Sequence, residues 1–231
     1  METITRQAFR ELAAQGALVP VYRELPADLE TPVSVYLKLR GQGASFLLES
    51  VEQAEQIGRY SFLGFNPQRQ VIAQDNKVTV LSREGARQVD LQPGQDPLHV
   101  VAEELARYQP VIPVQGNGDL PRFSGGAVGY LGYDMARFFE RLPETARDEL
   151  TLPALHMLVT DTLVIFDHVR HRLLLCANAH VPEGCDPDAV YDRALARLDE
   201  IEAQMRAPLP APVSYTHLTL PTTLPRCRSR W

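Results

Sequence analysis

The chain has 231 residues and a formal net charge of −6 at pH 7. Apolar residues make up 45% and charged residues 23%, a globular composition that argues against a disordered, collagen-like or coiled-coil protein. An acidic chain is not expected to be a general nucleic-acid binder. No run approaches the roughly 20 apolar residues of a membrane span, and the N-terminus lacks a signal-peptide pattern. Three cysteines are too few for a disulfide framework, so we expect a cytoplasmic protein.

The first third of the chain predicts two short helices and a strand before a run of β-structure. Residues 5–15 form the first expected helix, and residues 18–22 a short strand in which Pro20 indicates an edge or a bulge. Thr31 is the expected N-cap of a second helix, with Pro32 at its first position. The strands predicted next are 45–51, 60–65, 70–74, 77–81 and 86–91.

The remaining elements complete an α+β pattern. We expect a helix from Asp96 through Tyr108 and a glycine-rich strand pair over residues 122–133. A long hairpin then joins residues 155–166 to 172–177, and residues 187–205 form a long surface helix. This order predicts mainly antiparallel sheets with flanking helices, because the strands do not alternate with helices as in a parallel sheet.

The composition changes near the C-terminal end, and we divide the chain there. Residues 1–206 form the main region, residues 207–212 are a Pro-rich linker, and residues 213–231 form a tail without acidic residues. Ten residues of the tail, starting at Val213, resemble one reading frame of a transposon-based sequencing adapter. We hypothesise that the tail is not native, a natural disordered tail being the alternative. Without its three arginines, the remaining 20 basic and 29 acidic residues give a net charge of −9.

Two polar positions next to apolar strands are candidate ligand contacts. The strand around Phe46 ends on Glu49 and Ser50, whose side chains suit the ammonium and carboxylate groups of an amino acid. The simpler interpretation is a core strand that becomes polar as it reaches solvent. Arg59 could hold a carboxylate through two hydrogen bonds, but such arginines more often form surface ion pairs.

The segment 123–134 is unusual because residues 125–132 include four glycines. Glycine is costly inside a strand, so we expect another backbone or a ligand to approach closely there. A crowded, twisted strand packed on a helix is the favoured interpretation. The spacing does not match the G-x-G-x-x-G dinucleotide fingerprint, and no βαβ unit surrounds it.

The other reactive residue types give no catalytic or metal site. His168 and His171 have ligand-like spacing but fall on a predicted hairpin turn, and Cys176 lies in an apolar run typical of a buried residue. No Ser/His/Asp set or nucleophile elbow is evident. We therefore assign no catalytic residue and no metal ligand within this chain.

Several segments in order resemble the N-terminal region of one enzyme family, anthranilate synthase component I. The resemblance covers about residues 5–212. It rests on residues 20–22 (PVY), 31–36 (TPVSVY), 46–50 (FLLES), 58–64 (GRYSFLG), 125–130 (GGAVGY) and 133–134 (YD). The Leu-Leu-Glu-Ser element is the part that separates this family from related chorismate enzymes.

The resemblance implies a regulatory rather than a catalytic role for this chain. In that family the Leu-Leu-Glu-Ser element lines the pocket for tryptophan, the feedback inhibitor, which assigns L-tryptophan binding to Leu48, Glu49 and Ser50 here. Tryptophan would act by binding the inactive arrangement more tightly than the active one. The family makes anthranilate and pyruvate from chorismate, with Mg²⁺ and with ammonia from a glutamine amidotransferase subunit.

The same resemblance places the chorismate and Mg²⁺ sites in a C-terminal part that this sequence does not contain. We therefore expect this polypeptide to be inactive by itself. Two alternatives stay open: the large subunit of aminodeoxychorismate synthase, which serves folate synthesis, and a non-catalytic amino-acid-binding domain. The second alternative predicts a natural stop codon soon after Pro212.

Overall fold

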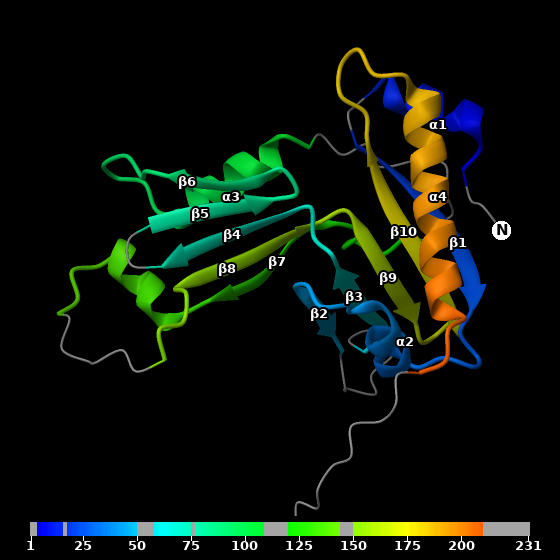
Figure 1. The fold of residues 1–231 in the computed structure, drawn as a ribbon, viewed down its shortest axis with the longest axis horizontal. Coiled ribbons are helices and arrows are strands. Elements are labelled where there is room, and N and C mark those ends of the chain that lie inside the picture. The colour runs from blue at the N-terminus through cyan, green and yellow to red at the C-terminus, as the bar shows by residue number, and fades with distance from the viewer. Residues whose placement is uncertain are drawn as a thin grey trace, which may run out of the picture.

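The computed structural model describes residues 4–15, 18–49, 58–74, 77–108, 120–143 and 150–209, and these form two antiparallel sheets (Figure 1). The first sheet has the order β1 (Leu18–Pro26), β10 (Arg172–His180), β9 (Thr162–Asp167), β3 (Tyr60–Phe65) and β2 (Ser45–Leu48). The second has the order β6 (Gly85–Val89), β5 (Lys77–Ser82), β4 (Arg69–Gln74), β8 (Leu155–Thr160) and β7 (Gly126–Leu131). The predicted α+β class with mainly antiparallel sheets is confirmed.

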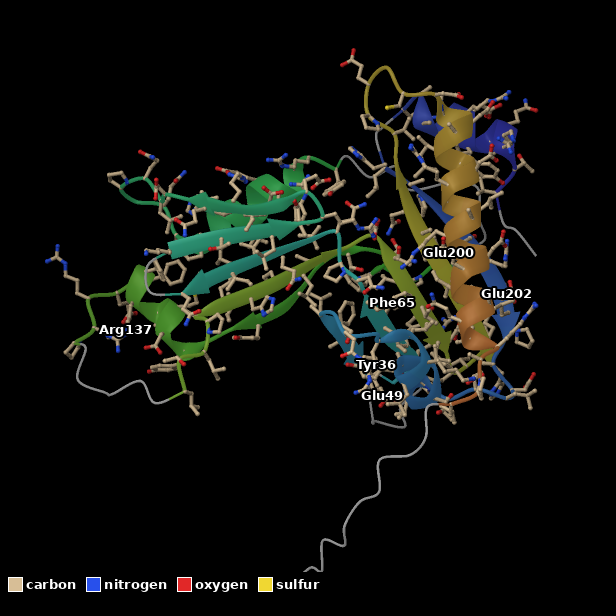
Figure 2. All side chains as sticks on the ribbon, in the orientation of Figure 1. Tyr36, Glu49, Phe65, Arg137, Glu200 and Glu202 are labelled. Atoms are coloured by element: carbon tan, nitrogen blue, oxygen red, sulfur yellow. The ribbon has the colours of Figure 1, made fainter. Side chains whose placement is uncertain are left out.

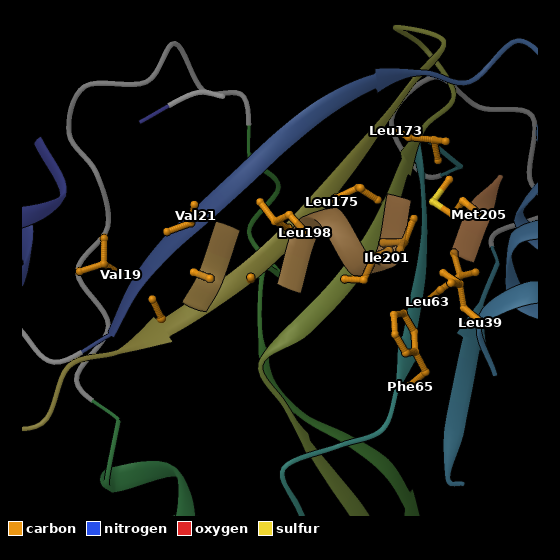
Figure 3. Packing of buried hydrophobic residues seen from close by; sticks show 14 of the residues in the cluster. Val19, Val21, Leu39, Leu63, Phe65, Leu173, Leu175, Leu198, Ile201 and Met205 are labelled. Atoms are coloured by element: carbon orange, nitrogen blue, oxygen red, sulfur yellow. The ribbon is translucent and has the colours of Figure 1, made fainter. Parts of the chain in front are cut away.

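Three helices cover one face of the first sheet: α1 (Arg6–Ala13), α2 (Pro32–Leu39) and α4 (Pro187–Met205). Leu198 and Ile201 of α4 are fully buried against strand residues such as Leu175 and Leu63 (Figure 3). Thr31 is the N-cap of α2, as its sequence predicts, because its hydroxyl accepts a hydrogen bond from the backbone N–H of Ser34 at 3.1 Å. The apolar faces of these helices therefore supply the larger core of the molecule.

The second sheet is covered on one face by α3 (Pro97–Ala106) and by a 3₁₀ helix, η1 (Tyr133–Phe138). Val71 and Val80 of the sheet pack against Val100 of α3 and Met135 of η1 in a separate, smaller core. Glu104 of α3 is fully buried, and its carboxylate pairs with three arginines, Arg69, Arg87 and Arg107. Each sheet thus has its own helical layer.

The prediction of a single strand over residues 155–166 is wrong, because the segment divides at Asp161 into two strands, β8 and β9. The backbone C=O of Asp161 accepts a hydrogen bond from the N–H of Asn178 at 2.7 Å, and its carboxylate accepts one from Gln68 Nε2 at 2.5 Å. These bonds hold the chain where it leaves one sheet and enters the other. Gln68 lies on the connection from β3 to β4, which also passes from the first sheet to the second. The hydrogen bond between Gln68 and Asp161 therefore joins the two connections between the sheets.

The glycine-rich segment forms one strand, β7, followed by η1, and not the predicted strand pair. Its two ends bond to other parts of the chain instead of to each other. Asn178 Nδ2 donates to the C=O of Ser124 at 2.6 Å, and the N–H of Gly132 donates to the C=O of Ala154 at 2.7 Å. Strand β1 is also longer than predicted, because it pairs with β10 along its full length.

Within the described residues, no helix is both long enough and apolar enough to cross a membrane.

Candidate functional site

The predicted tryptophan-binding element lies at an edge of the first sheet, on strand β2. Leu48 is the last residue of β2, faces Phe62 of β3 in the register, and is 46% exposed. Glu49 follows directly and is exposed (Figure 2). Ser50 lies outside the described residues. The structure thus presents Leu48 and Glu49 at the accessible end of an edge strand, where a ligand can reach them.

Aromatic side chains gather on the sheet face that carries Leu48. Phe62 packs edge-on against Phe123 with ring centroids 5.3 Å apart, and Tyr60 lies 6.0 Å from Phe62. These residues, together with Phe46, border a core of five buried residues that includes Ile165 and Cys176. An indole ring could pack against such a surface, because offset and edge-on aromatic contacts are favourable. The aromatic surroundings were not predicted from the sequence, since they depend on strand register.

Gly64 shows how tightly β2 is packed against β3. Phe46 and Gly64 are direct cross-strand partners, and the Phe46 ring lies over the glycine. A Cβ atom at residue 64 would stand 2.1 Å from Cε1 of Phe46. The glycine therefore leaves the space that the phenylalanine ring fills beside the candidate site.

Arg59 forms an ion pair, as the commoner of its two interpretations predicts, but the pair is not a surface one because its partner, Asp167, is fully buried. Its Nε and Nη2 atoms donate to the two carboxylate oxygens of Asp167 at 3.0 and 2.8 Å. Burial would raise the pKa of Asp167, but the hydrogen bonds from Arg59 and the backbone N–H of Arg170, with the charge of Arg172, lower it overall. A ligand carboxylate would have to displace Asp167 to reach this arginine.

The crowded-strand interpretation of the glycine-rich segment also agrees with the structure. A Cβ atom at Gly129 would lie 1.9 Å from the backbone oxygen of His156 on β8, and one at Gly125 would lie 2.4 Å from Asn178 Nδ2. Another backbone, rather than a ligand, accounts for the glycine at residue 129.

The histidines and cysteines of the described residues lie apart or are buried. His168 accepts or donates a hydrogen bond with Ser61 Oγ at 2.8 Å, and His171 lies at the β9–β10 turn with φ of 49°. Cys176 is fully buried, and burial raises the pKa of its thiol to about 12, which makes it unreactive.

The described residues do not fit the Mg²⁺ ion that the resemblance implies. No group of three or more His, Cys, Asp and Glu side chains in the described part of the chain is arranged to hold a metal ion. The buried carboxylates of Glu104 and Asp167 are already paired with arginines. We therefore derive no chemical step through a metal in this chain.

These features define an α+β protein with two antiparallel sheets, whose candidate site is the accessible end of an edge strand. A solved structure shares this fold. The crystal structure of anthranilate synthase component I from Streptococcus pneumoniae TIGR4 matches with a TM-score of 0.51 and 24% identity, over 80% of this chain and 37% of that one.

Sequence comparison identifies the protein that the chain resembles. The chain is homologous to anthranilate synthase component 1 from Mycobacterium tuberculosis H37Rv, with 39% identity over 215 residues, and from Pseudomonas aeruginosa, with 38% over 212 residues. The Synechocystis protein of the same name is 37% identical over 219 residues. The resemblance seen in the sequence motifs is confirmed. No protein-family model matches the chain.

The matches cover this chain almost fully but its relatives only in part. The M. tuberculosis match covers 92% of this chain and 41% of the relative, and the P. aeruginosa match covers 89% and 40%. The Synechocystis match covers 94% and 42%. The chain therefore spans about two fifths of the length of the curated relatives that it matches.

Proposed function

We propose that this chain is the N-terminal, tryptophan-sensing part of an anthranilate synthase component I. The single observation that carries the proposal is the 39% identity to the M. tuberculosis protein over nearly the whole chain, with only 41% of that relative covered. The chain then works within a longer polypeptide, a lyase that converts chorismate and ammonia into anthranilate and pyruvate. That reaction is the first step of tryptophan biosynthesis.

The proposal gives this chain a regulatory and scaffolding role. Leu48, Glu49 and Ser50 bind L-tryptophan at the end of β2, and the aromatic residues Phe62 and Phe123 lie on the face that carries Leu48. The exposed edge position of Leu48 and Glu49 supports this assignment, because a ligand can reach both. Glu49 supplies a carboxylate for the ligand ammonium group, and backbone groups beyond the paired part of β2 are candidates for its carboxylate.

The catalytic work belongs to the polypeptide outside the matched region. Chorismate and Mg²⁺ bind there, and the metal neutralises carboxylate charge on the substrate. A glutamine amidotransferase subunit delivers ammonia to the same active site.

A chimeric enzyme tests the proposal. Residues 5–209 of this chain replace the matched part of the M. tuberculosis relative, which is 39% identical. With chorismate, ammonium and Mg²⁺, the chimera is expected to form anthranilate, identified by chromatography and mass. The unmodified relative is the positive control, and this 231-residue chain alone is expected to form none.

The outcomes separate the alternatives. Formation of anthranilate by the chain alone would contradict the assignment of catalysis to the rest of the polypeptide. A folded chimera that yields no product would count against the proposed role. Aminodeoxychorismate as the product of the enzyme expressed from the full-length gene of this chain would favour the folate-pathway enzyme.

A further inference from the structure

The two sheets have four edge strands, and three of them are poorly suited to bind another strand. An exposed edge pairs readily with a further strand unless it is short, charged or interrupted by proline. Strand β1 contains Pro20 and Pro26, and β2 has only four residues. Strand β6 is exposed over four of its five residues and carries Arg87 and Gln88.

The fourth edge strand, β7, has none of these protections. It has six residues, Gly126–Leu131, without proline or charge, and it pairs only with β8 among the described strands. Exposed apolar side chains lie at the last residue of β7 and in the segment that follows it: Leu131 is 51%, Tyr133 90% and Phe139 60% exposed. We call strand β7 together with Tyr130, Leu131, Tyr133 and Phe139 the β7 edge surface.

Exposed apolar side chains are concentrated around this surface. Of the twelve large apolar residues that are exposed in the described part of the chain, seven lie between residues 130 and 152. The seven are Tyr130, Leu131, Tyr133, Phe139, Leu142, Leu150 and Leu152. A hydrogen bond of 2.7 Å from Gly132 to the C=O of Ala154 joins the two segments that carry them. Such concentration is typical of an interaction site.

The β7 edge surface is held in place from the inside. Gly129 lies against the backbone of His156, and Met135 of η1 is buried in the smaller core. Arg137 and Asp134 form an ion pair of 2.8 Å on η1, at the end of the second sheet far from α4 (Figure 2). The exposed side chains thus stand on a packed support that need not reorganise to bind a partner.

We propose that the β7 edge surface binds an extended, apolar strand from the polypeptide outside the matched region, which adds a sixth strand to the second sheet. The inference rests on the proposed function, which places this chain in a longer protein. The M. tuberculosis relative has more than half of its length outside the match, since the match covers 41% of it. Backbone hydrogen bonds along β7 supply affinity, and the apolar side chains supply specificity.

Hydrogen exchange compares the chain alone with the chimera described above. The amides of β7 that face away from β8 are expected to exchange about tenfold or more slowly in the chimera, because new strand pairing protects them. Strand β6 is the matched control, since it is the other edge of the same sheet. Its amides are expected to exchange equally in both proteins.

A double variant, Tyr133→Ser with Phe139→Ser, tests the side chains. It is expected to remove the extra β7 protection in the chimera but to leave the melting temperature of the isolated chain unchanged, because both residues are exposed there. Leu29→Ser is the control, since Leu29 is 97% exposed between β1 and α2. It is expected to change neither measurement.

Three results would overturn the inference. The first is equal exchange of β7 in the isolated chain and in a chimera that makes anthranilate, which would leave the proposed function standing. The second is β7 protection in the isolated chain that rises with its concentration, which would identify a second copy as the occupant. The third is a lower melting temperature of the isolated double variant. A chimera without activity whose β7 is nevertheless protected would instead count against the proposed function alone.

Discussion

At the residue scale, the candidate ligand-binding side chains that the sequence singles out fall into two groups. Leu48 and Glu49 stand at an accessible strand end, whereas the Arg59 guanidinium is held by Asp167 at 2.8 Å. The sequence leaves both interpretations of Arg59 open because its partner lies 108 positions away. Only the pairing of β3 with β9 brings the two charges together.

The Asp167 carboxylate is expected to stabilise the fold in a pH-dependent way. Its side chain is fully buried, and the nearby arginines lower its pKa below the ordinary value of 3.8. Asp167→Asn should therefore lower the free energy of unfolding by roughly 2 kcal/mol at pH 7, after allowance for the partial exposure of Arg59. Chemical denaturation measures the change.

The sign of the pH effect follows from the lowered pKa. The stabilisation is present above pH 3.8 and is lost as the pH falls through the lower folded-state pKa of Asp167. The free energies of unfolding of the wild type and of Asp167→Asn should therefore converge in acid. Asp134→Asn is the control, because its exposed pair with Arg137 is worth little. A difference in the free energy of unfolding between wild type and Asp167→Asn that is as large at about pH 2 as at pH 7 would contradict this account.

At the element scale, local signals predict helix starts well and strand limits less well. The Thr31-Pro32 and Asp96-Pro97 pairs mark the starts of α2 and α3, because an N-cap and a following proline act within one turn. The division at Asp161 has no comparable local signal. It depends on hydrogen bonds from Gln68 and Asn178, which are distant in sequence.

Gly129→Ala tests whether crowding explains the glycine-rich strand. The added methyl would meet the His156 oxygen at 1.9 Å, so β7 or β8 must shift. We expect a loss of roughly 2 kcal/mol or more in the free energy of unfolding, in the range of overpacked sites. Gly43→Ala is the control, because its Cβ would meet only the end of the Asn66 side chain at 3.3 Å. Equal stability of the two variants would show that β7 tolerates a side chain there.

At the scale of the whole molecule, the class of fold follows from the order of predicted elements, but the grouping of strands does not. Strands β3 and β4 are neighbours in sequence yet belong to different sheets, and β1 pairs with β10, more than 140 positions later. Such long-range pairing is set by burial of a sheet face in the folded chain rather than by any local pattern. The motifs predicted the similarity to anthranilate synthase component I where periodicity could not, because they are specific residue strings rather than a repeating apolar pattern.

The division of the chain into a main region, a Pro-rich linker and a tail stays a prediction. Residues 207–209 are described and follow α4, but the tail at 213–231, with Trp231 and its three arginines, lies outside the described residues. The Pro-rich composition still predicts a linker there. Determination of the genomic sequence downstream of this gene segment would test the adapter hypothesis.

Tryptophan inhibition of the chimera tests the central claim most directly. Anthranilate formation is measured against L-tryptophan concentration for the chimera and for its Ser50→Phe variant, with Ser82→Phe at the last residue of β5, in the other sheet, as control. We predict that both parent and control are inhibited, and that Ser50→Phe keeps activity but needs about tenfold or more L-tryptophan for half inhibition, since the larger side chain fills the ligand position. Equal sensitivity of an active Ser50→Phe variant would contradict the assignment of tryptophan sensing to the end of β2.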